Sequence, residues 1–226
     1  YVDSEVPNQA DKNNLPLNVK DFDAKGDGQA DDSMSIQQTI DAAVQGEIPT
    51  VEMPEGDYYI ASPIEIKPNI HLKMTPNTKI IVDNSLENGI VASGSEGFSS
   101  QISSDMSIRN TVVNIEDASG FQAGDLVMLR DAYKPANNQP QRGEMHYVRE
   151  ASEKQIILEE ATWSEYKVSN NAEVVKINPV HNIRISGGVI QGGGADAEQA
   201  AAIDLLYAVG VVIDSTVIKN WYYRGI

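Results

Sequence analysis

A tight turn and the start of a helix are combined in the peptide Val19-Lys-Asp-Phe-Asp-Ala-Lys-Gly-Asp-Gly-Gln-Ala-Asp-Asp-Ser-Met-Ser-Ile-Gln-Gln-Thr-Ile-Asp-Ala-Ala43. Its first residues predict a short strand, after which Gly26 and Gly28 can adopt the positive φ that a tight turn requires. Asp31 and Asp32 stand where a helix N-cap belongs. Their carboxylates can accept the free N–H groups of the first turn and face the positive end of the helix dipole.

An amphipathic helix is expected to follow these aspartates. Apolar residues recur there at near-helical spacing, at Met34, Ile36, Ile40, Ala43 and Val44. Gly46 is expected to end the helix, since glycine is favoured just beyond a helix C-terminus. The pattern predicts one helix over residues 32–45, and the polar residues 1–18 predict an N-terminal arm or linker.

Short β segments replace the helical pattern from Pro49 onward. Apolar and polar residues alternate within them, and Pro, Gly and Asn punctuate the gaps, with Pro54-Glu-Gly56 as a turn. Together with the preceding turn and helix, they predict a capped set of first coils over residues 19–99. The expected strands are Thr50–Met53, Tyr58–Ile60, Ile64–Ile66, Ile70–Met74, Ile80–Val82 and Gly89–Ala92.

Residues 100–178 differ in composition from the segments on either side, and they predict a small inserted β-rich subdomain. Their length is at the low end of the range for a domain that folds on its own. The short-strand rhythm returns over residues 179–226. The expected strands of the insertion are Val112–Ile115, Leu126–Leu129, His146–Arg149, Ile156–Leu158 and Glu173–Ile177.

An internal repeat follows the insertion. The peptide that starts at Asn182 can be laid on the one that starts at Gly210, an offset of 28 residues that places Ile185 on Ile213. A second echo pairs Ala202-Ile203 with Gly225-Ile226. Repeats with a period of about 20–50 residues are typical of stacked architectures. Strands this short, with no helix in the repeat, favour a parallel β-solenoid, and an ordinary β-sandwich meander is the alternative.

Composition narrows the classes of function. The 226 residues include 17 Lys and Arg, 33 Asp and Glu and no Cys, for a net charge of −16. The absence of Cys excludes a disulfide framework and a thiolate zinc site. The acidic balance argues against nucleic acid and anionic membranes as partners. No apolar run approaches the roughly 18 residues that a membrane span needs, so no membrane insertion is expected.

Metal and nucleotide motifs are incomplete. An EF-hand template begun at Asp23 places Lys25 and Met34 where oxygen ligands belong, so turn and capping roles are expected for the aspartates of residues 23–32. The glycines near residues 187–194 lack a following Gly-Lys-Ser/Thr and predict tight corners. The histidines share no ligand spacing, so no metal site is expected, and a divalent cation such as calcium is the one cofactor left open. They are His71, His146 and His181.

Two groups of side chains near the C-terminal end are candidates for carbohydrate chemistry. Glycoside hydrolysis needs two carboxyl groups about 5–9.5 Å apart, and aromatic rings offer a flat apolar face to a sugar. The alternatives are solvated turn carboxylates and aromatic packing within the next coil. The carboxylate candidates are Asp196, Glu198, Asp204 and Asp214. The substrate-binding candidates are Trp221, Tyr222, Tyr223 and Arg224.

The N-terminal peptide resembles the signature of the pectate-lyase-like superfamily, and the match extends to Met53-Pro-Glu-Gly-Asp-Tyr58. Asp23 replaces the usual Gly and Ser33 the usual Thr. The resemblance implies an all-β fold, a single-stranded right-handed parallel β-helix with an N-terminal capping α-helix and a small β-rich insertion. An open end of such a helix exposes unpaired N–H and C=O groups and needs a cap. The signature residues are Gly26, Asp27, Gly28, Asp31, Asp32, Pro54 and Gly56.

The insertion is similar to those of phage tail spikes and appendages in this superfamily. The resemblance implies a homotrimeric virion protein that meets other tail proteins and binds, and degrades, a host glycopolymer such as teichoic acid or capsule. Hydrolysis and lyase elimination both remain open. The coil rhythm at Trp221–Ile226 predicts further coils beyond Ile226, and the resemblance implies that the catalytic residues lie on them. The alternatives are a secreted bacterial lyase or hydrolase and a non-catalytic structural spike.

Overall fold

The computed structural model describes residues 15–133, 142–194, 200–221 and 223–226. The chain divides into two compact units, which are described separately. The first consists of Tyr1–Ser93 and Val180–Ile226, and the second is Gly94–Pro179. No helix within the described ranges is long and apolar enough to cross a membrane.

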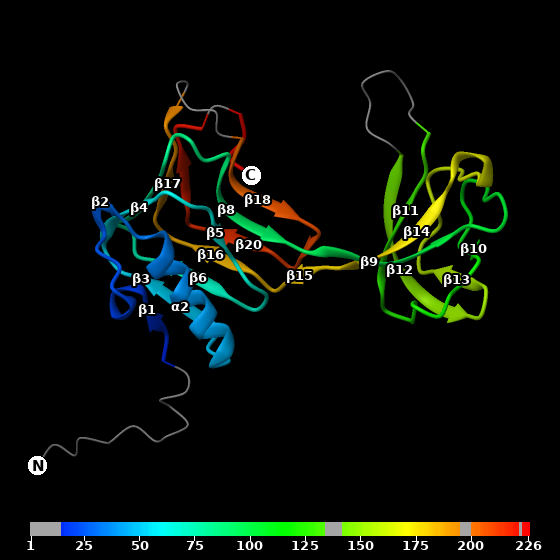
Figure 1. The fold of residues 1–226 in the computed structure, drawn as a ribbon, viewed down its shortest axis with the longest axis horizontal. Coiled ribbons are helices and arrows are strands. Elements are labelled where there is room, and N and C mark those ends of the chain that lie inside the picture. The colour runs from blue at the N-terminus through cyan, green and yellow to red at the C-terminus, as the bar shows by residue number, and fades with distance from the viewer. Residues whose placement is uncertain (1–14, 134–141, 195–199, 222) are drawn as a thin grey trace, which may run out of the picture. The chain divides into compact units, whose positions relative to one another are not determined.

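The first unit is a parallel β-helix with three principal sheets, as predicted (Figure 1). Every strand pair in them is parallel. One sheet has the order β1 (Leu17–Asn18), β3 (Thr50–Met53), β6 (His71–Met74), β16 (Arg184–Ser186) and β20 (Val212–Asp214). The next has the order β2 (Asp27–Asp31), β4 (Gly56–Ile60), β7 (Thr78–Val82), β17 (Val189–Gln191) and β21 (Val217–Lys219). The third pairs β5 (Ile64–Glu65), β8 (Asn88–Ser93) and β18 (Ala201–Leu206), and a small fourth pairs β15 (Val180–His181) with β19 (Ala208–Val209).

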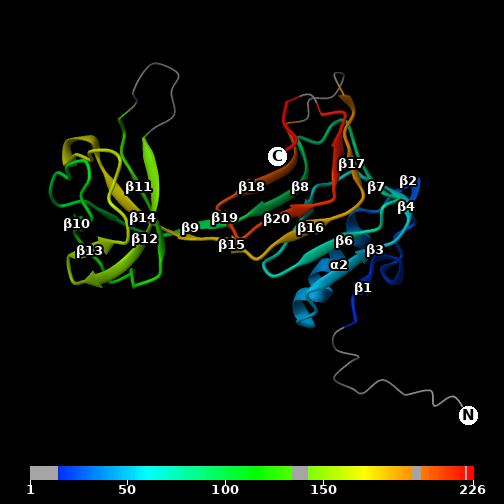
Figure 2. The same ribbon diagram turned by 180° about the vertical axis from the view of Figure 1, so that it is seen from behind.

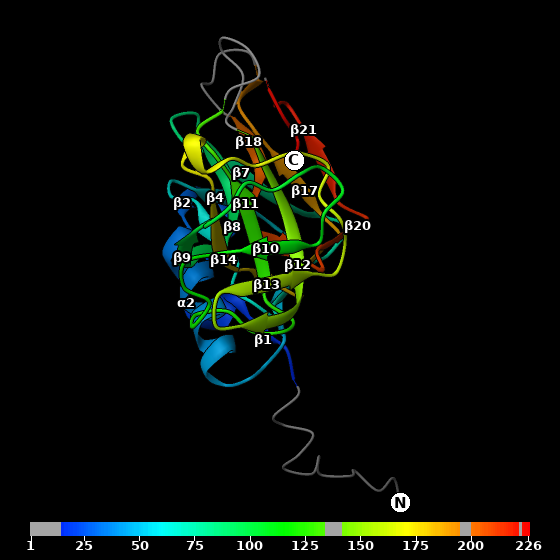
Figure 3. The ribbon, with the colours of Figure 1, turned by 90° about the vertical axis from the view of Figure 1, so that its right-hand side faces the viewer.

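Inward-facing side chains form columns through successive coils. Figure 2 shows β3, β6, β16 and β20 side by side, and the register aligns Val51, Leu72, Ile185 and Ile213. Figure 3 shows β17 beside β21, where the register aligns a second column, Tyr58, Ile80, Ile190 and Ile218. Each buried aliphatic side chain contributes about 1.5–3 kcal/mol through removal of apolar surface from water. The repeat of 28 residues is confirmed by these pairs.

Strands that precede the second unit in sequence pair directly with strands that follow it. Leu72 of β6 pairs directly with Ile185 of β16, and Ile80 of β7 with Ile190 of β17. The sequence between the two strands of each pair includes the whole of Gly94–Pro179. Coil stacking, and not chain continuity, therefore determines which strands are neighbours here.

The helix α2 (Ser33–Gln45) lies against β1, β3, β5 and the 3-10 turn Val19–Phe22. Its buried face holds Ile36, Ile40 and Ala43, as predicted. Met34 and Val44 were also expected on that face and are instead exposed, because each sits at its margin. Gly46 has an ordinary negative φ, and Glu47 takes the left-handed conformation that ends the helix.

The signature aspartates hold the N-terminal turn in place. Asp32 is buried at the N-cap position but does not cap the helix; its carboxylate accepts the N–H groups of Lys25 and Gly26. Asp31 instead accepts the N–H of Ser33, at 3.0 Å. The short strand expected in the first residues of the peptide that begins at Val19 is wrong, because Val19–Phe22 forms the 3-10 turn, and only Leu17–Asn18, just before it, is a strand. Asn18 is the N-cap of this turn, and its side chain accepts the N–H of Lys20.

Two turns of the signature touch each other. A β-carbon added at Gly56 would lie 2.9 Å from the carbonyl oxygen of Gly26, and Asp57 donates its N–H to the same oxygen at 3.0 Å. The hydroxyl of Tyr58 donates to the carbonyl of Pro54 at 3.0 Å. The close approach explains why a glycine is needed at residue 56.

The second unit is a six-stranded antiparallel sheet with its own apolar core. The insertion was predicted to begin at residue 100, whereas the unit begins at Gly94, because its first strand pairs with its last. That first strand, Ser-Glu-Gly-Phe-Ser-Ser-Gln, lacks an apolar alternation that would have predicted it. The sheet order is β10 (Val112–Asn114), β13 (Gln155–Leu158), β12 (Gly143–Ser152), β11 (Leu126–Arg130), β14 (Glu173–Asn178) and β9 (Ser95–Gln101).

Candidate functional site

A groove with a volume of about 440 Å³ crosses the last coils of the β-helix. Its floor is a stack of three backbone layers. Ala200 donates its N–H to the carbonyl of Glu87 at 2.7 Å, and Arg224 donates its N–H to the carbonyl of Ala200 at 3.0 Å. Stacked coils therefore bring residues 87, 200 and 224 together. The groove is lined by Glu87, Asn88, Ala200, Ala201, Asp204, Tyr223 and Arg224.

The groove combines the groups that a sugar chain needs. Tyr223 is 71% exposed and offers an aromatic face, while Arg224 supplies a guanidinium. Glu87 and Asp204 supply carboxylates that can accept hydrogen bonds from hydroxyl groups. Asp204 lies four residues beyond Ala200 on the same chain, which is roughly 13 Å along a strand. Because Glu87 lies beside Ala200, the backbones of Glu87 and Asp204 are farther apart than the two carboxyl groups of a glycosidase. The two carboxyl groups come within that distance only if both side chains turn toward each other.

Three of the sequence candidates lie together in this groove: Asp204, Tyr223 and Arg224. Trp221 does not line it. Its ring packs against the β-helix core, close enough that a β-carbon on Gly89 would lie 3.5 Å from Cη2 of the indole. Trp221 is therefore placed in packing against the core and outside the groove. The candidates Asp196, Glu198 and Tyr222 lie outside the described residues.

Asp214 belongs to a different sheet from Asp204 and does not form a pair with it. Its carboxylate forms a bidentate ion pair with Arg184, in which Nε and Nη2 donate to Oδ1 and Oδ2 at 2.9 and 3.2 Å. The guanidinium hydrogen bonds lower the pKa of Asp214. Next to this pair, Nε2 of His71 lies 2.7 Å from the hydroxyl of Ser186, and burial lowers the pKa of that imidazole. Asp214 is thus an ionised, paired surface group.

Sequence reasoning missed Glu87 and Asn88 as groove residues. They precede the second unit, whereas Ala200 and Arg224 follow it, so no local spacing connects them. Only the register β8–β18, with Ala201 opposite Asn88, brings them together. A repeat search that skipped residues 94–179 would have been the one usable signal.

The N-terminal aspartates have the expected turn roles, although Asp32 does not cap the helix. Asp27 accepts the N–H groups of Gln29 and Ala30, both at 2.9 Å, and these bonds lower its pKa. Asp32 holds the turn described above. Among the described side chains, no three of His, Asp or Glu converge in a way that would hold a metal ion.

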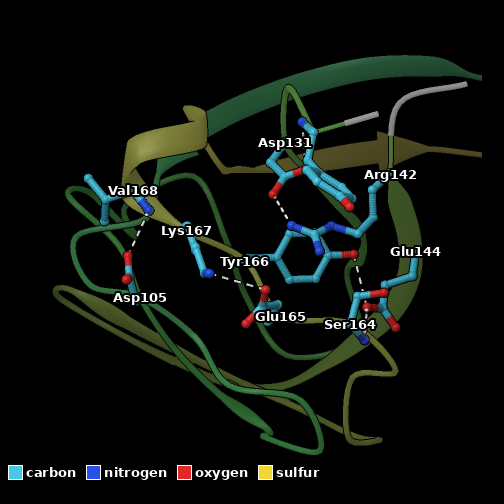
Figure 4. A network of polar contacts seen from close by, with 10 residues as sticks. Asp105, Asp131, Arg142, Glu144, Ser164, Glu165, Tyr166, Lys167 and Val168 are labelled. Carbon is cyan, nitrogen blue, oxygen red and sulfur yellow. Dashed lines mark hydrogen bonds and ion pairs between the residues drawn. The ribbon is translucent and has the colours of Figure 1, made fainter. Parts of the chain in front are cut away.

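A second polar cluster lies within the antiparallel unit (Figure 4). The guanidinium of Arg142 forms an ion pair with the fully buried Asp131 and lies 4.8 and 5.0 Å from the rings of Tyr133 and Tyr166. The hydroxyl of Tyr166 donates to Glu144 at 2.9 Å. Burial, and then that hydrogen bond, raise the pKa of the Tyr166 phenol. These contacts join Asp131 and Tyr133 to Arg142, and Glu144 to Tyr166. No sequence motif predicted the cluster.

Known proteins share the elements just described. Residues 17–87 match the family model described as rhamnogalacturonase A/epimerase, pectate lyase-like. This segment is pectate-lyase-like. It contains the signature turns, α2 and the first coils, so the predicted resemblance is confirmed.

Sequence relatives of this chain include enzymes of bacteria and phages. Alginate lyase 7 of Azotobacter vinelandii is 42% identical over 65 residues, which is 26% of this chain and 8% of that protein. A capsule K1-specific depolymerase of Klebsiella phage K64-1 is 23% identical over 167 residues, which is 72% of this chain and 19% of that protein. The chain thus spans less than one fifth of either relative.

Solved structures share the fold of this chain. The Gp54 tailspike of Acinetobacter baumannii bacteriophage AP22, in complex with A. baumannii capsular saccharide, has a TM-score of 0.73 at 18% identity, and the match covers 96% of this chain and 36% of that one. The tailspike gp61 of Pseudomonas phage phi297 has a TM-score of 0.63 at 17% identity, with 94% and 38% covered. The right-handed parallel β-helix with its N-terminal helix is therefore the fold of phage tailspikes.

Proposed function

We propose that this chain is part of a phage tail spike or appendage that binds a host cell-surface glycopolymer and cleaves it. The observation that carries the proposal is the likeness to a tailspike solved with capsular saccharide, which covers 96% of the chain and so includes both units. The relation to a phage capsule depolymerase over 72% of the chain supports the same class. Capsule and teichoic acid are the two polymer classes to test, and the assembly is expected to be a homotrimer that meets other tail proteins on the virion.

The groove of the last coils is the proposed saccharide-binding site. Stacking on Tyr223 and hydrogen bonds from Arg224 would orient a sugar, and the carboxylates of Glu87 and Asp204 would bind its hydroxyl groups. A polymer that carries negative charge would be repelled by those two carboxylates and by the net charge of −16. Such a polymer would need Arg224, or a divalent cation such as calcium held between the carboxylates.

Binding and cleavage are tested with purified capsule and teichoic acid from candidate hosts. Reducing ends report hydrolysis, and the ultraviolet absorbance of an unsaturated sugar reports elimination. Tyr223→Ala and Arg224→Ala are expected to weaken binding, whereas the exposed Lys154→Ala in the other unit serves as the matched control. Equal binding of the polymer by all three variants would exclude the groove as the saccharide-binding site.

Two alternatives make different predictions. A secreted bacterial lyase or hydrolase is favoured by the 42% identity to an alginate lyase over 65 residues, and it would be a monomer in solution. A structural spike would bind a glycopolymer and leave it intact. Sedimentation separates the trimer from the monomer, and the two cleavage assays separate the enzyme from the spike.

A further inference from the structure

The loop after β13 carries the most exposed aromatic side chain among those of the described large hydrophobic residues. Trp163 is 80% exposed, although a tryptophan ring strongly favours burial. The other tryptophan, Trp221, packs against the core of the β-helix. An exposed indole suits a binding surface, because its ring provides a large, rigid contact area at a low entropic cost.

The backbone on both sides of Trp163 is fixed. Glu144 accepts the N–H of Trp163 at 2.8 Å and that of Ser164 at 3.0 Å, and Figure 4 shows the carboxylate between Ser164 and the Tyr166 hydroxyl. On the other side, the nearly fully buried Thr162 donates its N–H to the carbonyl of Asn110 at 3.1 Å. A loop held in this way loses little further freedom when a ligand binds.

Arg109 lies next to this loop. Its N–H donates to the carbonyl of Thr162 at 2.9 Å, so the two backbones run side by side at this point. The side chain of Arg109 is exposed, and within the described ranges no carboxylate forms an ion pair with it. In a chain with a net charge of −16, an arginine without an acidic partner is a local site for an anion.

The backbone at Arg109 is also strained. Its φ is +63°, a left-handed conformation that costs an L-residue other than glycine or asparagine about 1–2 kcal/mol. Among the described residues, Asn69, Asn171, Asn182 and Asn220 take the equivalent conformation, and so do Asp23, Glu47, Tyr207 and Ser215. Turn geometry alone would favour asparagine at residue 109.

We propose that Trp163 and Arg109 form a second saccharide-binding site, located on the antiparallel unit and selective for a sugar residue that bears a carboxylate. The indole stacks on the apolar face of the pyranose, and the guanidinium binds the carboxylate through two parallel N–H donors. The site rests on the proposed glycopolymer function and extends it to a second unit of the chain.

The first test uses the 226-residue chain and three purified probes: oligomers of mannuronate, oligomers of galacturonate and neutral maltohexaose. Tryptophan fluorescence with acrylamide as quencher reports the exposure of Trp163, because Trp221 is already shielded. Either acidic oligomer is expected to protect the exposed fraction from quenching, and maltohexaose is not. Quenching that neither acidic oligomer changes at millimolar concentration overturns the proposal, and so does equal protection by maltohexaose.

The second test measures affinity by calorimetry in variants. Trp163→Ala and Arg109→Gln are each expected to weaken binding of the acidic oligomer about tenfold or more, since a lost charged hydrogen bond or stacked ring has this effect. Arg109→Asn should weaken binding to the same extent while the unfolding midpoint stays equal or rises, because the strain is relieved. A purely structural arginine would show the opposite pattern. Unchanged affinity in Trp163→Ala and Arg109→Asn overturns the site.

Groove variants separate this proposal from the function on which it rests. Arg224→Ala is expected to leave protection of Trp163 unchanged. If Arg224→Ala abolishes that protection while Trp163→Ala leaves affinity intact, the groove alone binds the polymer and the second site is wrong. If no glycopolymer is cleaved but Trp163 still responds to acidic oligomers, the enzymatic part of the proposed function fails and this site stands.

Discussion

Ile185 of β16 lies directly opposite Ile213 of β20, in parallel register, so residues 28 positions apart occupy equivalent places in consecutive coils. On its other side Ile185 pairs with Leu72, which precedes the antiparallel unit. The side chain of Ile185 is fully buried. It therefore joins the coils before the insertion to those after it.

Removing this junction should destabilise the β-helix. Ile185→Ala is expected to lower the free energy of unfolding by about 2–5 kcal/mol, through lost apolar burial and a cavity. Urea unfolding followed by the fluorescence of Trp221, which packs on the same core, measures the change. Val212→Ala, at a half-exposed position on the paired strand β20, is the control and should change stability by less than about 0.5 kcal/mol. Equal effects of the two substitutions would contradict the stacked column.

Two glycines with the same backbone conformation should respond differently to alanine. Gly187 and Gly194 have φ values of +74° and +78°, but a β-carbon on Gly187 would lie 2.1 Å from the carbonyl oxygen of Met74, and one on Gly194 would meet nothing within 4 Å. Gly194→Ala is expected to cost about 1–2 kcal/mol from the left-handed conformation alone. Gly187→Ala should cost clearly more, because the backbone of the neighbouring coil has to move. Thermal unfolding of both variants measures this difference. Similar unfolding midpoints would show that the turn at Gly187 is not tightly packed against Met74.

The contact between Tyr59 and Asp83 predicts a response to acid. Hydrogen bonds from the Ser85 hydroxyl, the Tyr59 hydroxyl and the Ser85 N–H lower the pKa of Asp83 to about 2, from 3.8. A carboxylate whose pKa is lower in the folded state stabilises the fold above its unfolded pKa, and the contribution is lost as the pH falls from 3.8 through about 2. Wild type should therefore lose more stability than Asp83→Asn between pH 5 and pH 2. Parallel pH profiles of the two proteins would contradict this assignment.

The buried ion pair of the antiparallel unit should be essential to that unit alone. Arg142→Gln leaves the fully buried Asp131 without its cation and is expected to destabilise the unit by about 3–5 kcal/mol. Hydrogen exchange followed by mass spectrometry should show faster exchange in residues 94–179 and unchanged exchange in β3 and β6. Arg149→Gln, an exposed arginine of the same strand region, is the control. Exchange that increases evenly through both units would mean that the cluster has no local role.

Local sequence features predicted most of the secondary structure. Alternation of apolar residues located the coil strands, and the spacing of Ile36, Ile40 and Ala43 located the helix, because these patterns depend only on neighbouring residues. The polar strand β9 was missed, since its pairing with β14 stabilises it without an apolar pattern. The capping role of Asp32 was wrong for a related reason, because competing N–H groups of residues 25 and 26 lie close to it only in the folded turn.

The candidate site was predictable only in part. Asp204, Tyr223 and Arg224 follow the insertion closely in sequence and were found together. Glu87 joins them only through coil stacking. Trp221 packs against the β-helix core and Asp214 pairs with Arg184 on another sheet, so neither lines the groove.

The amino-acid sequence alone was enough to predict a stack of coils made of short strands, capped by one helix. The reason is that the period of apolar residues in each local segment shows which side chains are buried. Which coils become neighbours across an inserted unit, and hence which distant side chains share a groove, was decided by the folded chain. The physical reason is that parallel backbone pairing and a shared apolar column select partners by register, and register across residues 94–179 leaves no trace in local spacing.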